Sequence, residues 1–299
     1  MNERKALLIL HGKQALNEDV RAAVHAMRER GWQLDVRLTW EGGDARRLVE
    51  EALDAGYPQL IAGGGDGTLR DVTDAMVKAE GKASLVLLPL GTANDFARAA
   101  GIPLEPAAAL ELLESEAQPV DLGEVNGEVF LNMGTGGFGS QVTAQTSEDL
   151  KKVLGAAAYL FTGLTRFTEL GAASVRLEGP DFNWEGELLA LGIGNGRQAG
   201  GGHVLCPEAV VDDGLLDISI LPAPQEVVGT LRDLLAGGLG LDSMFVRARL
   251  PWVEVKGSQG LDINLDGEPL QGDTLRFRVL PGALRLHLPA HSPLLSRRG

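Results

Sequence analysis

The chain has 299 residues, of which 44% are hydrophobic and 23% charged, so it has the composition of a globular protein with a sizeable core. Its formal net charge of -14 excludes a protein whose main partner is nucleic acid, because binding a phosphate backbone requires a basic face. A single cysteine, Cys206, excludes an internal disulfide, and no apolar run is long enough to span a membrane, so we expect a cytoplasmic protein without a transmembrane anchor.

Short apolar runs alternate with longer amphipathic segments over the first third of the chain. The apolar runs are ALLIL, QLDVRL, QLIAG and SLVLLP, and helical patterns follow them at residues 17–30, 44–55, 67–79 and 94–100. This alternation predicts a parallel β-sheet covered by helices. In such sheets, ligands bind where the strands end.

After about residue 120 the pattern changes to strand-like segments separated by turns, including a strong hairpin signal at Asn126-Gly127. Helical inserts are expected near residues 148–170 and 225–239. We therefore predict an α/β domain with a parallel sheet over residues 1–122. A mostly β sandwich domain follows over residues 123–299, and its C-terminal segment can return to the first domain.

The stretch GGGDGT follows the third apolar run and begins at Gly63. Glycines let the backbone approach a phosphate closely, and the N–H groups of the turn and of the next helix supply donors without formal charge. The Thr68 hydroxyl can add a donor, while Asp66 is placed to hold Mg²⁺ or orient a substrate hydroxyl. The alternative is a plain tight turn in which Asp66 caps its helix.

Three further stretches carry candidate groups. PLGTANDFA puts a second glycine loop at the end of the next strand, although Asn94 and Asp95 also suit a helix cap. Asp213 lies in AVVDDGLL, where adjacent acids are equally consistent with an ordinary turn. NLDGEPL presents Glu268 beyond a hairpin turn, and that carboxylate matters only if the fold brings it to the nucleotide.

Taken together and in order, GGGDGT, PLGTANDFA, GNGRQAGGG, CPEAVVDDGLLD and NLDGEPL resemble the catalytic-domain family of diacylglycerol kinases, and most closely the YegS-like bacterial lipid kinases. The resemblance implies a kinase that depends on ATP and Mg²⁺, with an active site between an α/β domain and a β-sandwich. NAD kinases share this plan. The first loop, His11-Gly12-Lys13, departs from the asparagine found in related kinases, so no phosphate role is carried over to it.

The resemblance also implies roles for individual residues. ATP contacts would come from Thr39, Gly64, Gly65, Asp66, Gly67, Thr68, Leu69, Arg70, Asp71, Thr92 and Asn94. Glu268 would be the base that takes the proton of the lipid hydroxyl, with Asp66 as a second catalytic residue. Asp213 and the backbone oxygens of Val210 and Leu215 would hold a metal, Mg²⁺ or Ca²⁺, in a structural or a catalytic role.

These observations predict an ATP-dependent kinase that phosphorylates the hydroxyl of a membrane lipid. Phosphatidylglycerol is the expected substrate, with diacylglycerol or a sphingoid base as competitors. A soluble NAD kinase and a noncatalytic nucleotide-binding regulator are the alternatives. The apolar segment 151–167, with its flanking lysines and arginine, suits transient contact with the inner membrane face but equally suits a core-facing helix. Neither a nucleic-acid nor a protein partner is indicated.

Overall fold

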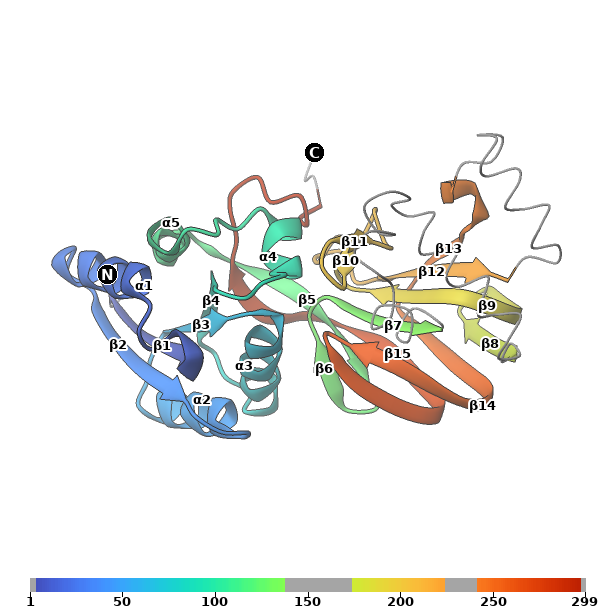
Figure 1. The fold of residues 1–299 in the computed structure, drawn as a ribbon, viewed down its shortest axis with the longest axis horizontal. Helices are drawn as coiled ribbons and strands as arrows, with labels where there is room; N and C mark the ends of the chain where they lie inside the picture. Colours follow the sequence, from blue (N-terminus) through green and yellow to red (C-terminus); the bar gives the residue numbers. More distant parts are fainter. Residues whose placement is uncertain (1–3, 138–173, 224–240, 297–299) are drawn as a thin grey trace.

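The computed structural model describes residues 4–137, 174–223 and 241–296, which form two halves lying side by side (Figure 1). In the first half, parallel strands are arranged in the order β4-β3-β1-β2. They are β1 (Lys5–His11), β2 (Gln33–Thr39), β3 (Gln59–Gly64) and β4 (Ser84–Pro89). The carboxyl ends of these strands therefore share one edge of the sheet.

Helices cover both faces of this sheet. They are α1 (Glu18–Glu29), α2 (Asp44–Asp54), α3 (Asp66–Lys78), α4 (Asp95–Ala100) and α5 (Pro106–Leu110), with the short 3-10 helices η1 (Gly12–Gln14) and η2 (Glu111–Glu114). Leu7 and Ile9 of β1 pack with α2, α3 and α4, whereas Leu8 and Leu10 pack with α1 and α5. This alternation confirms the predicted α/β fold, because successive side chains of a strand point to opposite faces.

The second half is mostly β, as predicted. Its strands are β5 (Ala117–Val125), β6 (Glu128–Phe130), β7 (Met133–Gly137), β8 (Ser174–Gly179), β9 (Phe182–Gly194), β10 (Gln198–Ala199), β11 (His203–Val204), β12 (Leu216–Pro222), β13 (Val246–Leu250), β14 (Trp252–Leu265) and β15 (Glu268–His287), with the 3-10 helix η3 (Leu241–Met244). Asn126 and Gly127 join β5 to β6 with φ values of 51° and 87°. These positive values are those that a two-residue hairpin turn requires.

Strand β15 joins the two halves. Two apolar segments of the sequence form this single strand, with an irregularity between Leu280 and Leu284 around Gly282, whose φ is 58°. Its first part pairs with β14, and its last part pairs with β5 and with β4 through Leu286 and Leu85. One sheet therefore continues across both halves. The domain boundary at residues 122 and 123 falls inside β5 and stays a prediction.

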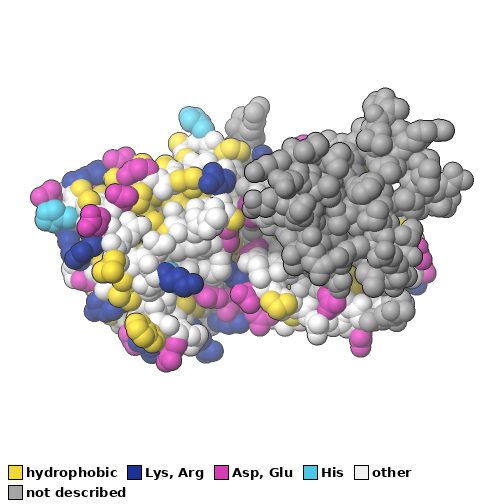
Figure 2. All heavy atoms as spheres, viewed as in Figure 1, with side chains coloured by type: hydrophobic (Ala, Val, Ile, Leu, Met, Phe, Trp, Pro, Cys, Tyr) yellow, Lys and Arg dark blue, Asp and Glu magenta, His cyan; other side chains and the backbone are white. Residues whose placement is uncertain are grey.

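The predicted helical inserts at residues 148–170 and 225–239, including the candidate membrane-contact segment 151–167, lie outside the described residues. Of the helices in the described ranges, none is both long and apolar enough to cross a bilayer. On the face shown in Figure 2, Lys and Arg side chains of the described residues are interspersed with Asp and Glu.

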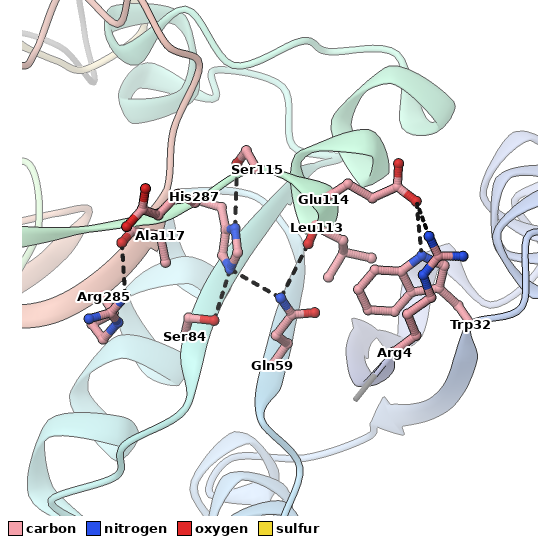
Figure 3. A pocket seen from close by; sticks show the side chains of 11 residues that line it. Arg4, Trp32, Gln59, Ser84, Leu113, Glu114, Ser115, Ala117, Arg285 and His287 are labelled. Carbon is pink, nitrogen blue, oxygen red and sulfur yellow. Dashed lines mark hydrogen bonds and ion pairs between the residues drawn. The ribbon is translucent and has the colours of Figure 1, made fainter. Parts of the chain in front are cut away.

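A cavity of about 600 Å³ lies at the amino ends of β3 and β4, at the opposite end of the sheet from the glycine loops. His287 lines it (Figure 3) and is only 2% exposed, with Nε2 2.8 Å from the Ser84 hydroxyl and Nδ1 3.4 Å from the Ser115 hydroxyl. Burial lowers the pKa of His287 below its ordinary value of 6.5. The imidazole is therefore a neutral part of the framework that anchors the end of β15.

This burial predicts a pH dependence of stability. Because folded His287 binds its proton more weakly than the unfolded chain does, its contribution is complete above pH 6.5 and is lost as the pH falls through the folded pKa. Replacing His287 by glutamine should flatten this loss in urea unfolding measured at a series of pH values. Burial raises the pKa of Asp217 to about 6, so Asp217 changes stability with pH in the opposite direction. The contribution of His287 is therefore read from the difference between the pH profiles of wild type and variant. The exposed His25→Gln serves as control, and equal slopes in wild type and His287→Gln would contradict the assignment.

Candidate active site

Two glycine loops touch at the carboxyl edge of the sheet, one after β3 and one after β4. A Cβ atom added to Gly91 would lie 2.5 Å from the Cα of Gly65, and one added to Gly64 would lie 2.3 Å from the Thr68 hydroxyl oxygen. Real Cβ atoms do not approach this closely, so only glycine fits at both positions. The predicted phosphate loops are therefore brought into backbone contact with each other.

Replacing Gly91 by alanine is expected to force the loops apart. Its Cβ would collide with backbone, which cannot move aside as a side-chain end can, and we expect a loss of about 1–3 kcal/mol in unfolding free energy. Gly67→Ala is the matched control, because nothing lies within 4 Å of its added Cβ and alanine favours the helix. Thermal unfolding without nucleotide checks both variants, and equal stability of the two would contradict this packing.

The Asp66 carboxylate caps helix α4 rather than its own helix. Its Oδ2 accepts from the backbone N–H of Asp95 at 3.0 Å, and its Oδ1 accepts from that of Phe96 at 3.1 Å. The N-cap residue of α3 is Gly65, which has no side chain to cap the helix. Asp66 thus ties the first glycine loop to the helix that follows the second. Its proposed role in positioning metal or phosphate stays a prediction.

Asn94 holds the second loop closed. Its Oδ1 accepts from the Gly91 N–H and its Nδ2 donates to the Gly91 carbonyl, both at 2.8 Å. Asn94 adopts the left-handed conformation with a φ of 50° and is 6% exposed, so its amide shapes the loop from within. Thr92, between the two, is exposed and free to meet a ligand.

Asp95 links this loop to the second half of the molecule. Its carboxylate, 5% exposed, accepts from the N–H groups of Gly201 at 2.9 Å and Gly202 at 2.7 Å, while its carbonyl accepts from Gln198. These glycines belong to GNGRQAGGG, whose position the sequence left open. Asp66 and Asp95 therefore form a continuous chain of hydrogen bonds from the first glycine loop to the β10–β11 hairpin.

The hairpin between β14 and β15 presents Glu268. Asp266 and Gly267 form the turn, with φ values of 48° and 103°. The Asp266 carboxylate accepts three backbone N–H bonds, at 2.8 Å from Leu131, 3.1 Å from Asn132 and 2.7 Å from Met133. The turn is thereby fixed to the segment before β7, and the Glu268 side chain remains exposed.

The negative charge of Glu268 influences the pKa of the Asp71 carboxyl group in α3. Packing around the Asp71 carboxyl raises its pKa, and the charge of Glu268 adds to this effect, while Arg70 opposes it. Arg70, 13% exposed, reaches across to the second half, where it pairs with Glu128 at 3.2 Å. The charge of Glu268 therefore reaches the helix that begins at the first glycine loop, and its role as the base stays a prediction.

The remaining predicted ATP contacts divide by position. Thr39 ends β2 beside His11 of β1, on the same sheet edge as the glycine loops. Leu69 is 2% exposed and packs in the core, while its backbone N–H donates to the Gly65 carbonyl.

Comparisons with known proteins show the family and the fold of the chain. Residues 5–125 match the diacylglycerol kinase catalytic domain, and residues 135–288 match the YegS C-terminal NAD kinase beta sandwich-like domain. A Pseudomonas fluorescens protein named "Probable lipid kinase YegS-like" is 77% identical over 295 residues, which is 99% of each chain. The chain belongs to the YegS-like lipid kinase family. A Pseudomonas aeruginosa protein of the same name is 72% identical over 99% of this chain and 98% of its own.

A solved structure extends the YegS-like comparison to the fold. A diacylglycerol kinase from Bacillus anthracis superposes with a TM-score of 0.75 at 21% identity, covering 97% of this chain and 98% of its own. The resemblance inferred from the ordered motifs is confirmed. The catalytic domain identifies this YegS-like chain as a phosphotransferase that uses ATP.

The metal assignment of this YegS-like chain concerns the loop before β12. Asp213 Oδ1 accepts from the Leu215 N–H at 3.0 Å, and its Oδ2 forms an ion pair with Arg249. Within the described ranges, no group of three or more His, Cys, Asp or Glu residues could hold a metal. One carboxylate already neutralised by a guanidinium fits a divalent cation poorly, because such cations prefer several oxygen ligands. A site built from Val210, Asp213 and Leu215 stays a prediction, and no step below uses it.

Sequence reasoning missed Asp121. Its Oδ2 accepts from the Gly214 N–H at 2.7 Å and its Oδ1 from the Gly282 N–H at 2.8 Å, so one buried carboxylate holds both the Asp213 loop and the kink of β15. The available signal was an acid inside the apolar run PVDLG. A buried carboxylate is costly unless it is hydrogen-bonded, so such a position points to a bonding role.

Proposed function

We propose that this YegS-like protein is an ATP-dependent kinase that phosphorylates a hydroxyl group of a membrane lipid, with phosphatidylglycerol as the substrate. The main support is the hairpin that presents Glu268. Asp266 ties this hairpin to residues 131–133, and the preceding strand β6 contacts helix α3 through Arg70. Phosphoryl transfer requires a positioned terminal phosphate and a hydroxyl aligned with it, and it needs no covalent nucleophile. Glycine loops and one exposed carboxylate are the parts that such a reaction needs.

In the proposed reaction, the backbone N–H groups of the two glycine loops bind the phosphates at the start of helix α3. Glu268 accepts the proton of the lipid hydroxyl while the hydroxyl oxygen attacks the terminal phosphorus of ATP, and ADP leaves. Mg²⁺ bound with ATP would neutralise the charge of the phosphates. The chain of bonds from Asp66 through Asp95 keeps both loops aligned with the second half of the molecule.

The lipid substrate follows from the relatives, which are named lipid kinases, and from the closest subgroup that the motifs resemble. The protein would act at the cytoplasmic face of the inner membrane and contact it transiently. Diacylglycerol and sphingoid bases are the competing substrates. A soluble NAD kinase shares the two-part plan, but the GTANDFA and LDGEP motifs favour the lipid enzyme.

A transfer assay tests the proposal. The purified protein is incubated with Mg²⁺, ATP labelled at the terminal phosphate, and either NAD or vesicles that contain phosphatidylglycerol, diacylglycerol or a sphingoid base. We expect label in phosphatidylglycerol. Label in another lipid instead would show that phosphatidylglycerol is not the substrate. Label in NAD alone would reject a lipid kinase. Binding of ATP without any transfer would favour a noncatalytic regulator.

A further inference from the structure

Trp40 is 94% exposed, although it follows directly after the last residue of strand β2. Its backbone is firmly held: the Asp44 Oδ2 accepts from the N–H groups of Trp40 at 2.6 Å and Glu41 at 3.0 Å. Arg47 first, and then these two N–H groups, lower the pKa of Asp44 to about 2, so the carboxylate stays ionised and the loop stays tied. A large aromatic ring is thus presented bare on a rigid loop.

The strand order places this ring in a line with the glycine loops. From β4 the sheet runs through β3 and β1 to β2, so Trp40 lies two strands from the first glycine loop, about 10 Å at the usual strand spacing. Between them, a Cβ added to Gly12 would lie 2.4 Å from the Thr39 carbonyl oxygen. Position 12 can therefore carry no side chain, and the backbone that follows β1 lies directly against the end of β2 there.

We propose that Trp40 stacks on the nucleobase of the bound nucleotide and so fixes the base end of ATP. With the phosphates on the loops after β3 and β4, an extended nucleotide crosses the end of β1 and brings its base over the end of β2. A nucleobase offers the flat π-face that an exposed indole binds best. The inference rests on the proposed use of ATP, not on the identity of the phosphoryl acceptor.

The charges around Trp40 favour a base over a bilayer. A membrane-contact surface joins aromatic side chains to a surplus of Lys and Arg. Here Glu41 follows Trp40 directly, and the neighbouring Arg46 and Arg47 of α2 are each paired with acidic side chains. This edge of the sheet therefore lacks the cationic surplus that anionic headgroups attract, whereas the base of a nucleotide is neutral.

Nucleotide binding without lipid tests the inference. Affinities of the full chain for MgATP and for magnesium tripolyphosphate, which has no base, are measured by calorimetry for wild type, Trp40→Ala, Trp40→Leu and Trp40→Phe. We expect Trp40→Ala and Trp40→Leu to weaken MgATP binding between about fivefold and a hundredfold, and Trp40→Phe much less. Tripolyphosphate affinity should stay unchanged in all three variants. Leu104→Ala, which removes another exposed apolar side chain, should change neither affinity.

Each other outcome is decisive. MgATP affinity within twofold of wild type in Trp40→Ala overturns the inference, and if vesicle binding falls instead, the side chain contacts the bilayer. Equal loss of MgATP and tripolyphosphate affinity also overturns it, because the whole loop would then be disturbed. A wild-type chain that binds neither ligand overturns both this inference and the use of ATP. Normal stacking with no transfer to lipid would refute only the proposed lipid kinase.

Discussion

Replacing Glu268 by glutamine is expected to lower kcat about 10²–10⁴-fold, because glutamine keeps the shape of the side chain but cannot accept the proton of the lipid hydroxyl. MgATP affinity and the thermal unfolding temperature should stay close to wild type, since the exposed Glu268 side chain makes no hydrogen bond or ion pair within the described residues and the backbone pairing of the hairpin is unchanged. Initial rates at saturating ATP and lipid check the loss. The loss should appear in kcat rather than in KM, because the carboxylate acts in the transition state.

Asp273→Asn is the matched control for Glu268→Gln. It removes one exposed carboxylate from the same strand, β15, away from helix α3. We expect Asp273→Asn to retain normal turnover, so that a general loss of negative charge from the strand cannot account for the effect. Near-normal kcat in Glu268→Gln would remove Glu268 from the role of base and leave Asp71, which its charge influences, as the next carboxylate to test.

The first half of the molecule could be predicted from the sequence because its signals are local. Strand β1 is a short apolar run, and helix α1 begins where Asn17 supplies the cap, accepting from the N–H groups of Asp19 and Val20. Each such element depends on residues a few positions apart, so periodicity and capping chemistry are sufficient to place it. The sequence did not predict helix α5, because the five residues PAAAL are too few to show a repeating helical pattern.

The bonds that connect the motifs could not be predicted in the same way. Asp66 was considered as a cap for its own helix, and a single sequence contains nothing to show that its partner is helix α4, which begins 29 residues later. Asp95 likewise bonds glycines more than a hundred residues away. Such partners are fixed by tertiary packing, which brings together loops that are far apart in the sequence. Family resemblance named the residues, whereas the structure shows what several of their side chains bond.

Asp266 provides the second large effect, and here the effect is on stability. In Asp266→Asn the turn can persist, because asparagine tolerates the left-handed conformation. The amide, however, offers one acceptor oxygen in place of two and turns an NH₂ group toward the backbone donors of Leu131, Asn132 and Met133. At least one N–H then loses its partner, and we expect a loss of about 1–3 kcal/mol in unfolding free energy, measured by urea unfolding.

Asp262→Asn separates this effect from a general change of charge on strand β14. Asp262 is exposed and bonds only the side chain of Gln271, so its replacement should change the unfolding free energy by no more than about 0.5 kcal/mol. If Asp266→Asn were equally mild, the three bonds would not hold the hairpin. If Asp266→Asn lowers the stability as expected, the three bonds of Asp266 hold the hairpin in place. Part of the stability that this variant loses should return when MgATP is added. The proposed phosphate loops do not include Asp266, and a ligand that binds only the folded chain stabilises it.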